Sequence, residues 1–388
     1  TVIDVPATAD LGFTFIGEQG DTHKILWMSD EEFLYAYRAH EHLKGGEEYA
    51  QRPGVPYRGS PVAAFRILSH FDVQRQYNAQ TGEQTNVIGE NTTDRPWYER
   101  QYMRVDWSNN LISDFTFSGG SVSQQPVARY VREGENDRDA AKITPNYLDV
   151  VHELVAQPAT NDWLSNYYGF KILNCWLYSA IHTDCMGSRL RVRSSFMKAK
   201  DDYVYTPQQY DDNKMLKFGY FRTDRYGYDR YYGIVDTRVD YLVERFNLWT
   251  QRPGEEPCWD TTGMSPRPWA NCPNSAIRPI VYHVNEDTPE WLENGNRRVG
   301  DEWNRVFKEV VSSMTGRPVA DLPDVFIMCL HNPVREGDPA ACGEPGLRPQ
   351  IGDLRYTFVY YVRATQMTSP LGYGPHAADP VTGEVISA

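Results

Sequence analysis

The sequence of 388 residues lacks any apolar run close to the ~18 residues that a membrane-spanning helix needs. Basic residues are also few, since 39 Lys and Arg stand against 52 Asp and Glu and leave a formal charge of -13. Nucleic-acid phosphates demand clustered Lys and Arg, so this balance argues against nucleic acid as a partner. With 40% hydrophobic and 23% charged residues, the composition is that of a globular protein long enough for two or three domains.

Sequence motifs of several enzyme classes are missing as well. There is no G-x-S-x-G nucleophile elbow and no G-x-x-x-x-G-K-[ST] phosphate loop, and Gly372 and Gly374 lack the third glycine of a dinucleotide site. The carboxylates single out no glycosidase pair by their spacing. The first residue is Thr1 rather than Met, with no charged-then-apolar leader after it, so we expect a further segment upstream.

Six cysteines form three pairs that are close in sequence: Cys175 with Cys185, Cys258 with Cys272, and Cys329 with Cys342. These intervals do not supply the short C-x-x-C spacing of metal sites. The even number and the local pairing favour disulfides over six free buried thiols. We therefore expect three disulfides in sequence order, and an exported protein that resides in the periplasm, at the outer cell surface or in the medium.

Alternating apolar and polar residues predict strands through most of the first two thirds of the chain. Phe71–Asn78, with the glycine-bearing turn after it, predicts a hairpin. Further strands are expected at Tyr98–Trp107, Arg189–Ala199, Phe218–Arg225 and Val239–Trp249. Ser29 and Glu32 fit a helical capping box, and the same stretch fits a strand equally well. Pro145–Ala156 places its apolar residues on one helical face and predicts a helix.

The last third changes character. A strand is expected at Ile277–Asp287, and Asp287 to Glu290 then supply an N-cap, a first-turn proline and a capping-box glutamate. The helix that starts there is expected to break near Gly295, to resume, and to end at Gly316. Its apolar stripe comprises Val299, Trp303, Val306, Phe307, Val310, Val311 and Met314. Strands are expected to follow at Asp324–Leu330 and Asp353–Arg363.

Four segments of this last third carry a resemblance. RPIVYHVNEDTPEW, GDEWNRVFKEV, GDLRYTFVYYV and GYGPHAADPVTGEVIS, which run in order from Arg278 to Ser387, resemble the stretch just upstream of the zinc helix in large bacterial metalloproteases of the metzincin type. In that group the last segment leads into H-E-x-x-H-x-x-G. No H-E-x-x-H occurs in this chain.

The resemblance implies an α+β fold with a predominantly β N-terminal region and an incomplete metzincin-like unit. We expect a β-rich domain at 1–140, a second β-rich region with one or two helices at 141–273, and the upstream half of a catalytic domain at 274–388. The implied function is peptide-bond hydrolysis by an exported zinc metalloprotease whose zinc ligands and general base lie downstream of Ala388. The chain alone is then expected to hold no zinc, to be inactive, and to need the downstream segment as its partner.

The resemblance also implies a substrate site, because extended peptides add to the exposed edge strand nearest the zinc helix. This assigns Gly372, Tyr373, Gly374, Pro375 and His376 to the substrate cleft, with an ordinary exposed loop as the alternative. A different class of function stays open too: a non-catalytic binding or structural protein of the cell surface that keeps a metzincin-like remnant.

Other candidate residues form no recognisable metal or ligand set. His40 and His42 lie two positions apart in the sequence. His152-Glu153 begins like the zinc motif but has Ala156 where the second histidine belongs. We interpret both pairs of residues as structural or solvent-facing. His283 and His376 have no third ligand nearby in sequence. The aromatic cluster at Phe218–Gly233 fits stacking on a sugar or a protein, and it fits packing between sheets.

Overall fold

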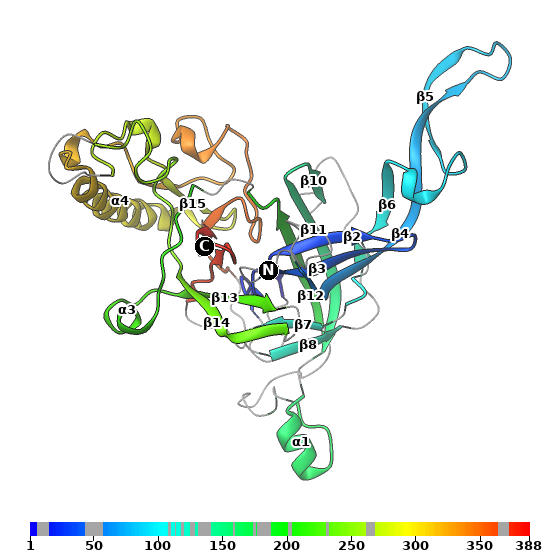
Figure 1. Cartoon of the computed structure of the whole chain (residues 1–388), viewed down its shortest axis with the longest axis horizontal. Coiled ribbons are helices and arrows are strands. Elements are labelled where there is room, and N and C mark those ends of the chain that lie inside the picture. Colours follow the sequence, from blue (N-terminus) through cyan, green and yellow to red (C-terminus); the bar gives the residue numbers. More distant parts are fainter. Residues whose placement is uncertain are drawn as a thin grey trace.

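The computed structural model (Figure 1) describes residues 1–5, 15–42, 57–107, 110–112, 114–117, 120–124, 129–130, 141–157, 160–173, 176, 188–200, 204–229, 233–260, 268–363 and 372–388. Its fold is α+β with strands predominating, as the sequence predicts. Two large sheets lie on one side of the molecule in Figure 1, and a unit built around one long helix lies on the other. The candidate site lies in the region that joins these parts.

The first seven-stranded sheet is antiparallel throughout. Its main order is β1 (Val2–Asp4), β12 (Ser188–Met197), β11 (Tyr147–Gln157), β8 (Gly120–Gln124) and β7 (Asp114–Phe117). Two short strands, β9 (Arg129–Tyr130) and β10 (Lys142–Thr144), also pair with β11. The sheet therefore combines strands from both 1–140 and 141–273.

Strand β11 corrects the helix predicted over Pro145–Ala156. It pairs with β12 at every position from Tyr147 to Ala156. Val150 and Val151 are adjacent in sequence and both fully buried, so both faces of the strand are covered. A strand that is buried on both faces lacks the alternation of apolar and polar residues that identifies a half-exposed strand. The spacing of the apolar residues in β11 therefore resembles that of an amphipathic helix.

The second seven-stranded sheet follows the order β14 (Gly233–Val243), β13 (Arg222–Asp229), β3 (Phe33–His42), β4 (Tyr57–Tyr77) and β5 (Gln84–Asn91), with β2 (Ile25–Ser29) beside β3 and β6 (Tyr102–Asp106) beside β4. The predicted hairpin is confirmed as β4–β5, which extends far from the body in Figure 1. The stretch after Ser29 forms a strand, because the Asp30 carboxylate accepts the backbone N–H groups of Glu32 and Phe33 at 2.9 and 2.7 Å and turns β2 into β3.

The C-terminal unit contains a parallel sheet in the order β16 (Phe326–Cys329), β15 (Ile280–Val284) and β17 (Thr357–Val359). Helix α4 (Glu293–Thr315) connects β15 to β16 after one 3-10 turn, η4 (Glu290–Leu292). The break predicted near Gly295 is wrong, because α4 runs through it, and a glycine costs a helix only about 1 kcal/mol relative to alanine. Gly316 ends the helix in the left-handed conformation, as predicted.

Helix α4 buries only part of its apolar stripe. Val311 is fully buried, and the Phe307 ring stacks on Phe326 of β16 with centroids 6.0 Å apart. Four other members of the stripe are more than a third exposed: Val299, Trp303, Val306 and Val310. The described residues thus leave a strip of apolar surface on α4 without cover.

A network of charges around two buried carboxylates, Asp149 and Asp353, joins the first sheet to the loop before β17. The Arg355 guanidinium donates to both carboxylate oxygens of Asp353, at 3.0 and 2.7 Å. On the sheet, Arg193 donates to Asp149 at 2.9 Å. The Lys142 ammonium lies 3.9 Å from the Asp149 carboxylate and 3.5 Å from that of Asp353, so it links the two pairs.

The remaining described elements are short. They are the helices α1 (Asp162–Tyr168) and α3 (Asp212–Lys217), the paired strands β18 (Ala377–Ala378) and β19 (Val385–Ser387), and the 3-10 turns η2 (Trp97–Glu99), η3 (Asn274–Ala276), η5 (Val319–Asp321) and η6 (Ala340–Cys342). Among the described helices, none has the length and apolarity to cross a membrane.

Two of the three expected disulfides are present. Cys258 bonds to Cys272, and Cys329 bonds to Cys342. All four of these cysteines are buried. Cys175 and Cys185 lie outside the described residues, so their pairing stays a prediction.

Candidate functional site

The chain leaves strand β14 at Val243 and continues as an extended segment, residues 244–251. The predicted strand was longer and reached Trp249, but the ladder with β13 stops at Val243. Isolated bridges follow, from Arg245 to Glu384 and from Trp249 to Ile277. Because its pairing passes to new partners, this segment leaves the sheet and becomes one wall of a large groove.

The opposite wall comprises residues 372–376 and the chain that leaves β17. Between the walls lies a cavity of about 1300 Å³. Residues 372–376 belong to no ladder within the described chain, and they lead into β18, which pairs only with β19 there. One wall of the groove therefore presents backbone that is not committed to a sheet.

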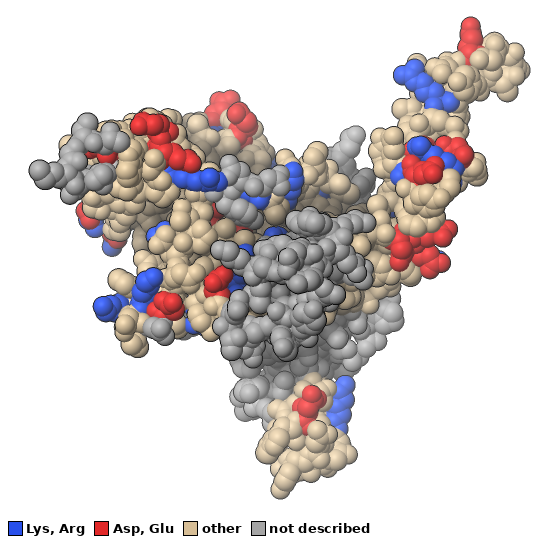
Figure 2. Space-filling view, viewed as in Figure 1, with Lys and Arg blue, Asp and Glu red and all other residues tan. Residues whose placement is uncertain are grey.

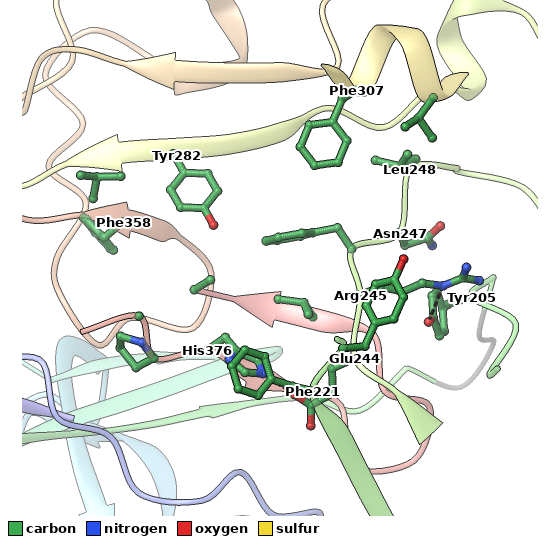
Figure 3. A pocket seen from close by; sticks show the side chains of 18 of the residues that line it. Tyr205, Phe221, Glu244, Arg245, Asn247, Leu248, Tyr282, Phe307, Phe358 and His376 are labelled. Atoms are coloured by element: carbon green, nitrogen blue, oxygen red, sulfur yellow. Dashed lines mark hydrogen bonds and ion pairs between the residues drawn. The ribbon is translucent and has the colours of Figure 1, made fainter. Parts of the chain in front are cut away.

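The floor of the groove is apolar. Phe246 and Leu248 come from the extended segment. Tyr282, Phe307 and Phe358, which Figure 3 labels, come from β15, α4 and β17. All of these side chains except Phe358 pack on the small core around Ile280, Val284, Phe326 and Met328. The groove is thus lined by elements that are far apart in the sequence.

A hydrogen bond between His376 and Glu244 closes the rim nearest the second sheet. His376 contacts Glu244 through Nε2, the Thr223 hydroxyl donates to the same carboxylate at 2.7 Å, and the Phe221 ring lies 4.8 Å from the imidazole. Burial alone would raise the pKa of Glu244, but the hydrogen bonds from His376 and Thr223 outweigh it and lower that pKa. Glu244 therefore stays ionised and holds His376 at the groove wall (Figure 3).

A guanidinium group lies further along the extended segment. Arg245 donates through Nε to the Tyr205 hydroxyl at 2.9 Å, and its guanidinium lies 5.4 Å from the centre of the Tyr205 ring. The backbone of Arg245 also bonds the last turn of the chain, to Gly383 at 3.2 Å and from Val385 at 2.9 Å. This arrangement fixes a guanidinium at the groove.

The turn at residues 379–384 holds the two walls in register. Glu384 is buried and accepts hydrogen bonds from Arg278 at 2.7 Å and from Lys200 at 3.2 Å. Gly383 has a φ of 78°, and an added Cβ would lie 2.5 Å from the Val243 carbonyl oxygen. Only glycine fits this close approach, so the turn ties the segment after His376 to the end of β14.

The structure places all the residues assigned to the substrate cleft, Gly372 to His376, at the groove wall. A Cβ added at Gly372 or Gly374 would meet nothing within 4 Å. The Tyr373 ring packs edge to face on Phe15, with centroids 4.9 Å apart. Their role in binding substrate stays a prediction.

The other candidate histidines do not converge. His152 is buried in β11, where Nε2 lies 2.7 Å from the Trp107 carbonyl oxygen and burial lowers the pKa of the ring. His283 is buried in β15, His40 lies in β3, and the side chain of His42 lies outside the described residues. Within the described residues, no group of three or more His, Cys, Asp or Glu side chains is placed to hold a metal ion.

The predicted aromatic cluster at Phe218–Gly233 divides between two environments. Phe218, Tyr220 and Phe221 are all exposed, and the last two line the groove. Tyr220 also packs edge to face on the buried Tyr210, with centroids 5.9 Å apart. Residues 230–232 lie outside the described chain. Packing within the protein thus holds for Tyr220, and stacking of the exposed rings on a ligand stays a prediction.

The sequence analysis missed the wall at residues 244–251. Glu244 and Arg245 stand inside a stretch that reads as one continuous strand, and only the interruption of its apolar pattern by two charges marks the place where the ladder ends. Comparison with protein-family models, with curated proteins and with solved structures finds no match to this chain. The function is therefore inferred from the groove and from the resemblance of the last third.

Proposed function

We propose that this chain is the upstream part of an exported zinc-dependent metalloprotease of the metzincin type, and that its groove receives an extended peptide. The observation that carries the proposal is the placement of Gly372–His376 along a cavity of about 1300 Å³. Backbone outside any ladder on one wall offers main-chain hydrogen bonds, and the aromatic floor offers apolar contacts.

The order of elements supports the same proposal. The chain passes from β15 through α4 to β16 and β17 before it reaches Gly372, which is the order that the resemblance implies upstream of a zinc helix. The exposed stripe on α4 is apolar surface of the kind that a further segment covers.

The described residues themselves do not fit a zinc ion. In the proposed enzyme the metal ligands and the general base belong to residues downstream of Ala388, and this chain contributes peptide binding and orientation. No step of peptide hydrolysis is assigned to the residues described here.

The proposal is tested by comparing residues 1–388 with the same chain extended by the downstream residues of its gene. Metal analysis of the extended chain is expected to find one zinc ion per chain, and this chain is expected to cleave peptides of a fluorogenic library. Residues 1–388 alone are expected to do neither. A stop codon after Ala388 would favour the non-catalytic binding protein. Stoichiometric zinc together with cleavage by residues 1–388 alone would overturn the proposal.

The groove is tested in the extended chain by Gly374→Val, with Gly219→Val as the matched control. An added Cβ meets nothing within 4 Å at either glycine, so both variants are expected to fold, but only Gly374 lines the groove. A branched side chain there blocks close approach of a peptide backbone, and kcat/KM is expected to fall roughly tenfold or more, because about 1.4 kcal/mol is a factor of ten. Equal loss in both variants would remove Gly374 from the binding site.

A further inference from the structure

A second surface of the molecule carries a concentration of exposed aromatic side chains. It lies on the lobe formed by residues 160–173 and 176, which contains helix α1 and projects from the body at the bottom of Figure 1. Trp163 and Tyr167 are each 73% exposed. Tyr168, Phe170 and Trp176 are also more than half exposed. The lobe is distant from the groove and has no part in the function proposed above.

The lobe is built to hold these side chains in place. Asn161 caps α1 by accepting the Leu164 N–H through its side chain at 2.9 Å, and Gly169 ends the helix in the left-handed conformation. The Ser165 hydroxyl accepts the N–H of the buried Ile172 at 2.9 Å, and Thr160 forms a bridge to Leu173. The exposed rings are therefore presented by a closed, hydrogen-bonded loop.

The rings also contact one another. Trp163 and Tyr167, one helical turn apart, are nearly parallel with centroids 5.9 Å apart. Tyr167 meets Tyr168 edge to face at 4.9 Å, and Tyr168 lies 6.2 Å from Phe170. Together they form one continuous aromatic surface that water solvates poorly.

Shape and charge indicate what this surface meets. The lobe is convex, so it cannot enclose a peptide in the way that a groove does (Figures 1 and 2). Its described residues include one acid, Asp162, and one base, Lys171. Trp and Tyr have an apolar body with a polar tip, which suits the boundary between lipid headgroups and acyl chains.

We propose that the aromatic lobe at residues 160–173 and 176 inserts into the surface of a lipid bilayer with neutral headgroups. Insertion buries the rings of Trp163, Tyr167, Tyr168 and Phe170 while the hydroxyl groups stay among the headgroups. The formal charge of -13 on the whole chain opposes approach to anionic lipid. Binding is therefore strongest on zwitterionic vesicles and weakens as anionic lipid is added at low salt.

The test is flotation of the full chain with phosphatidylcholine vesicles, together with tryptophan quenching by lipids brominated on the acyl chain. The lobe variant is Trp163→Ala with Tyr167→Ala, substitutions that favour a helix. Its control is Tyr77→Ala with Tyr98→Ala, which removes two comparably exposed rings, 64% and 67%, from other elements. The lobe variant is expected to lose roughly tenfold or more in partitioning, since each buried ring contributes strongly, and the control is expected to match the wild type.

Several results would overturn the proposal. These are no flotation of the wild type, an equal loss in the control variant, or tighter binding to phosphatidylglycerol vesicles. Retention on an insoluble polysaccharide without vesicle binding would assign the lobe to sugars instead. A dimer in sedimentation that the lobe variant abolishes, again without vesicle binding, would assign it to a second copy of the chain.

Discussion

At the rim of the groove, Glu244 holds His376 and the Thr223 hydroxyl at once. The hydrogen bonds that lower its pKa exist only in the folded state, so they stabilise the fold at pH values above the ordinary pKa of 4.5 and are lost as the pH falls through the lowered value. The carboxylate is only partly shielded from water, which limits its contribution.

We expect Glu244→Gln to lower the free energy of unfolding by about 1 kcal/mol near pH 6, because a partly buried charge-assisted hydrogen bond contributes about that much. The difference from the wild type should close as the pH falls below the ordinary glutamate range. Urea unfolding of both proteins between pH 6 and pH 3.5 measures this. A difference that is constant over the whole range would show that the carboxylate charge is irrelevant.

His283 is a buried imidazole that stays neutral. It packs edge to face on Tyr356 at 5.4 Å, and burial lowers its pKa to about 4 from the ordinary 6.5. The unfolded chain therefore binds a proton below pH 6.5 that the folded chain refuses until about pH 4. This difference has no effect on the free energy of unfolding above pH 6.5, and it lowers that free energy progressively as the pH falls from 6.5 toward 4.

The variant His283→Phe fills the same space without titrating. When the pH is lowered from 7.5 to 4.5, the free energy of unfolding of this variant should decrease less than that of the wild type. The two decreases should differ by about 2 kcal/mol, since one pKa unit corresponds to about 1.4 kcal/mol. Tyr356→Phe changes the neighbouring ring without changing a charge in this range, and it should keep the wild-type dependence. If both variants follow the wild type, His283 carries no pH dependence.

Among the elements, α4 offers two glycines with opposite surroundings. A Cβ at Gly300 would lie 2.7 Å from the Cβ of Met328 on β16, whereas a Cβ at Gly295 would meet nothing within 4 Å. Alanine favours a helix over glycine by about 1 kcal/mol at either position. At Gly300 the close approach of helix and strand opposes that gain.

We expect Gly295→Ala to raise the free energy of unfolding by up to about 1 kcal/mol, and Gly300→Ala to lower it by about 1 to 3 kcal/mol. Chemical denaturation of the two variants, monitored by circular dichroism, shows whether helix propensity or the packing of α4 on β16 dominates at Gly300. Stabilisation by Gly300→Ala would mean that α4 does not approach β16 as closely as described.

The elements also show where the sequence was sufficient. The period of helix α4 and its glycine end at Gly316 were predictable, but its start was not, because α4 begins at Glu293 and Asp287 does not cap it. The β4–β5 hairpin was predictable because its turn lies between alternating strands. Strand β11 was not predictable, because its residues from Tyr147 to Glu153 face buried surroundings on both sides and only pairing with β12 reveals it. Local pattern fails where burial is two-sided.

At the scale of the whole molecule, one disulfide, Cys258–Cys272, lies in the core cluster that contains Trp249 of the extended segment, and the other, Cys329–Cys342, joins β16 to η6. Closures of 14 and 13 positions each stabilise the fold by about 3 kcal/mol in the chain-entropy model. We expect reduction of the wild type to lower the melting temperature, and the double variant Cys329→Ala with Cys342→Ala to lower it as well. If Cys175 and Cys185 are unpaired, any further decrease that reductant causes in this variant reports the loss of the Cys258–Cys272 bond.

Peptide mapping without reduction tests the pairing directly, including the expected bond between Cys175 and Cys185. Pairing of Cys258 with any cysteine other than Cys272, or free thiols at these positions, would contradict the structure. Unchanged melting in reductant would show that the bonds add nothing to stability.

Only part of the candidate site was predictable from the sequence, because its residues come from distant parts of the chain. Gly372 to His376 could be singled out because a glycine-punctuated stretch resembles a known one. The facing residues Glu244 and Phe246 could not, because their meeting with that stretch depends on how the second sheet lies against the parallel sheet. No local pattern in the sequence carries that information.

The lining of the groove belongs to the beginning, the middle and the end of the chain, since it includes Phe15, residues 244–249 and residues 372–376. A ligand seated there would act as a noncovalent cross-link between parts that the backbone joins only through long loops. Its affinity would appear as thermal stabilisation of the entire fold, about 2.7 kcal/mol at a hundredfold excess over Kd. Melting temperature alone could then rank peptides, before any catalytic activity is in hand.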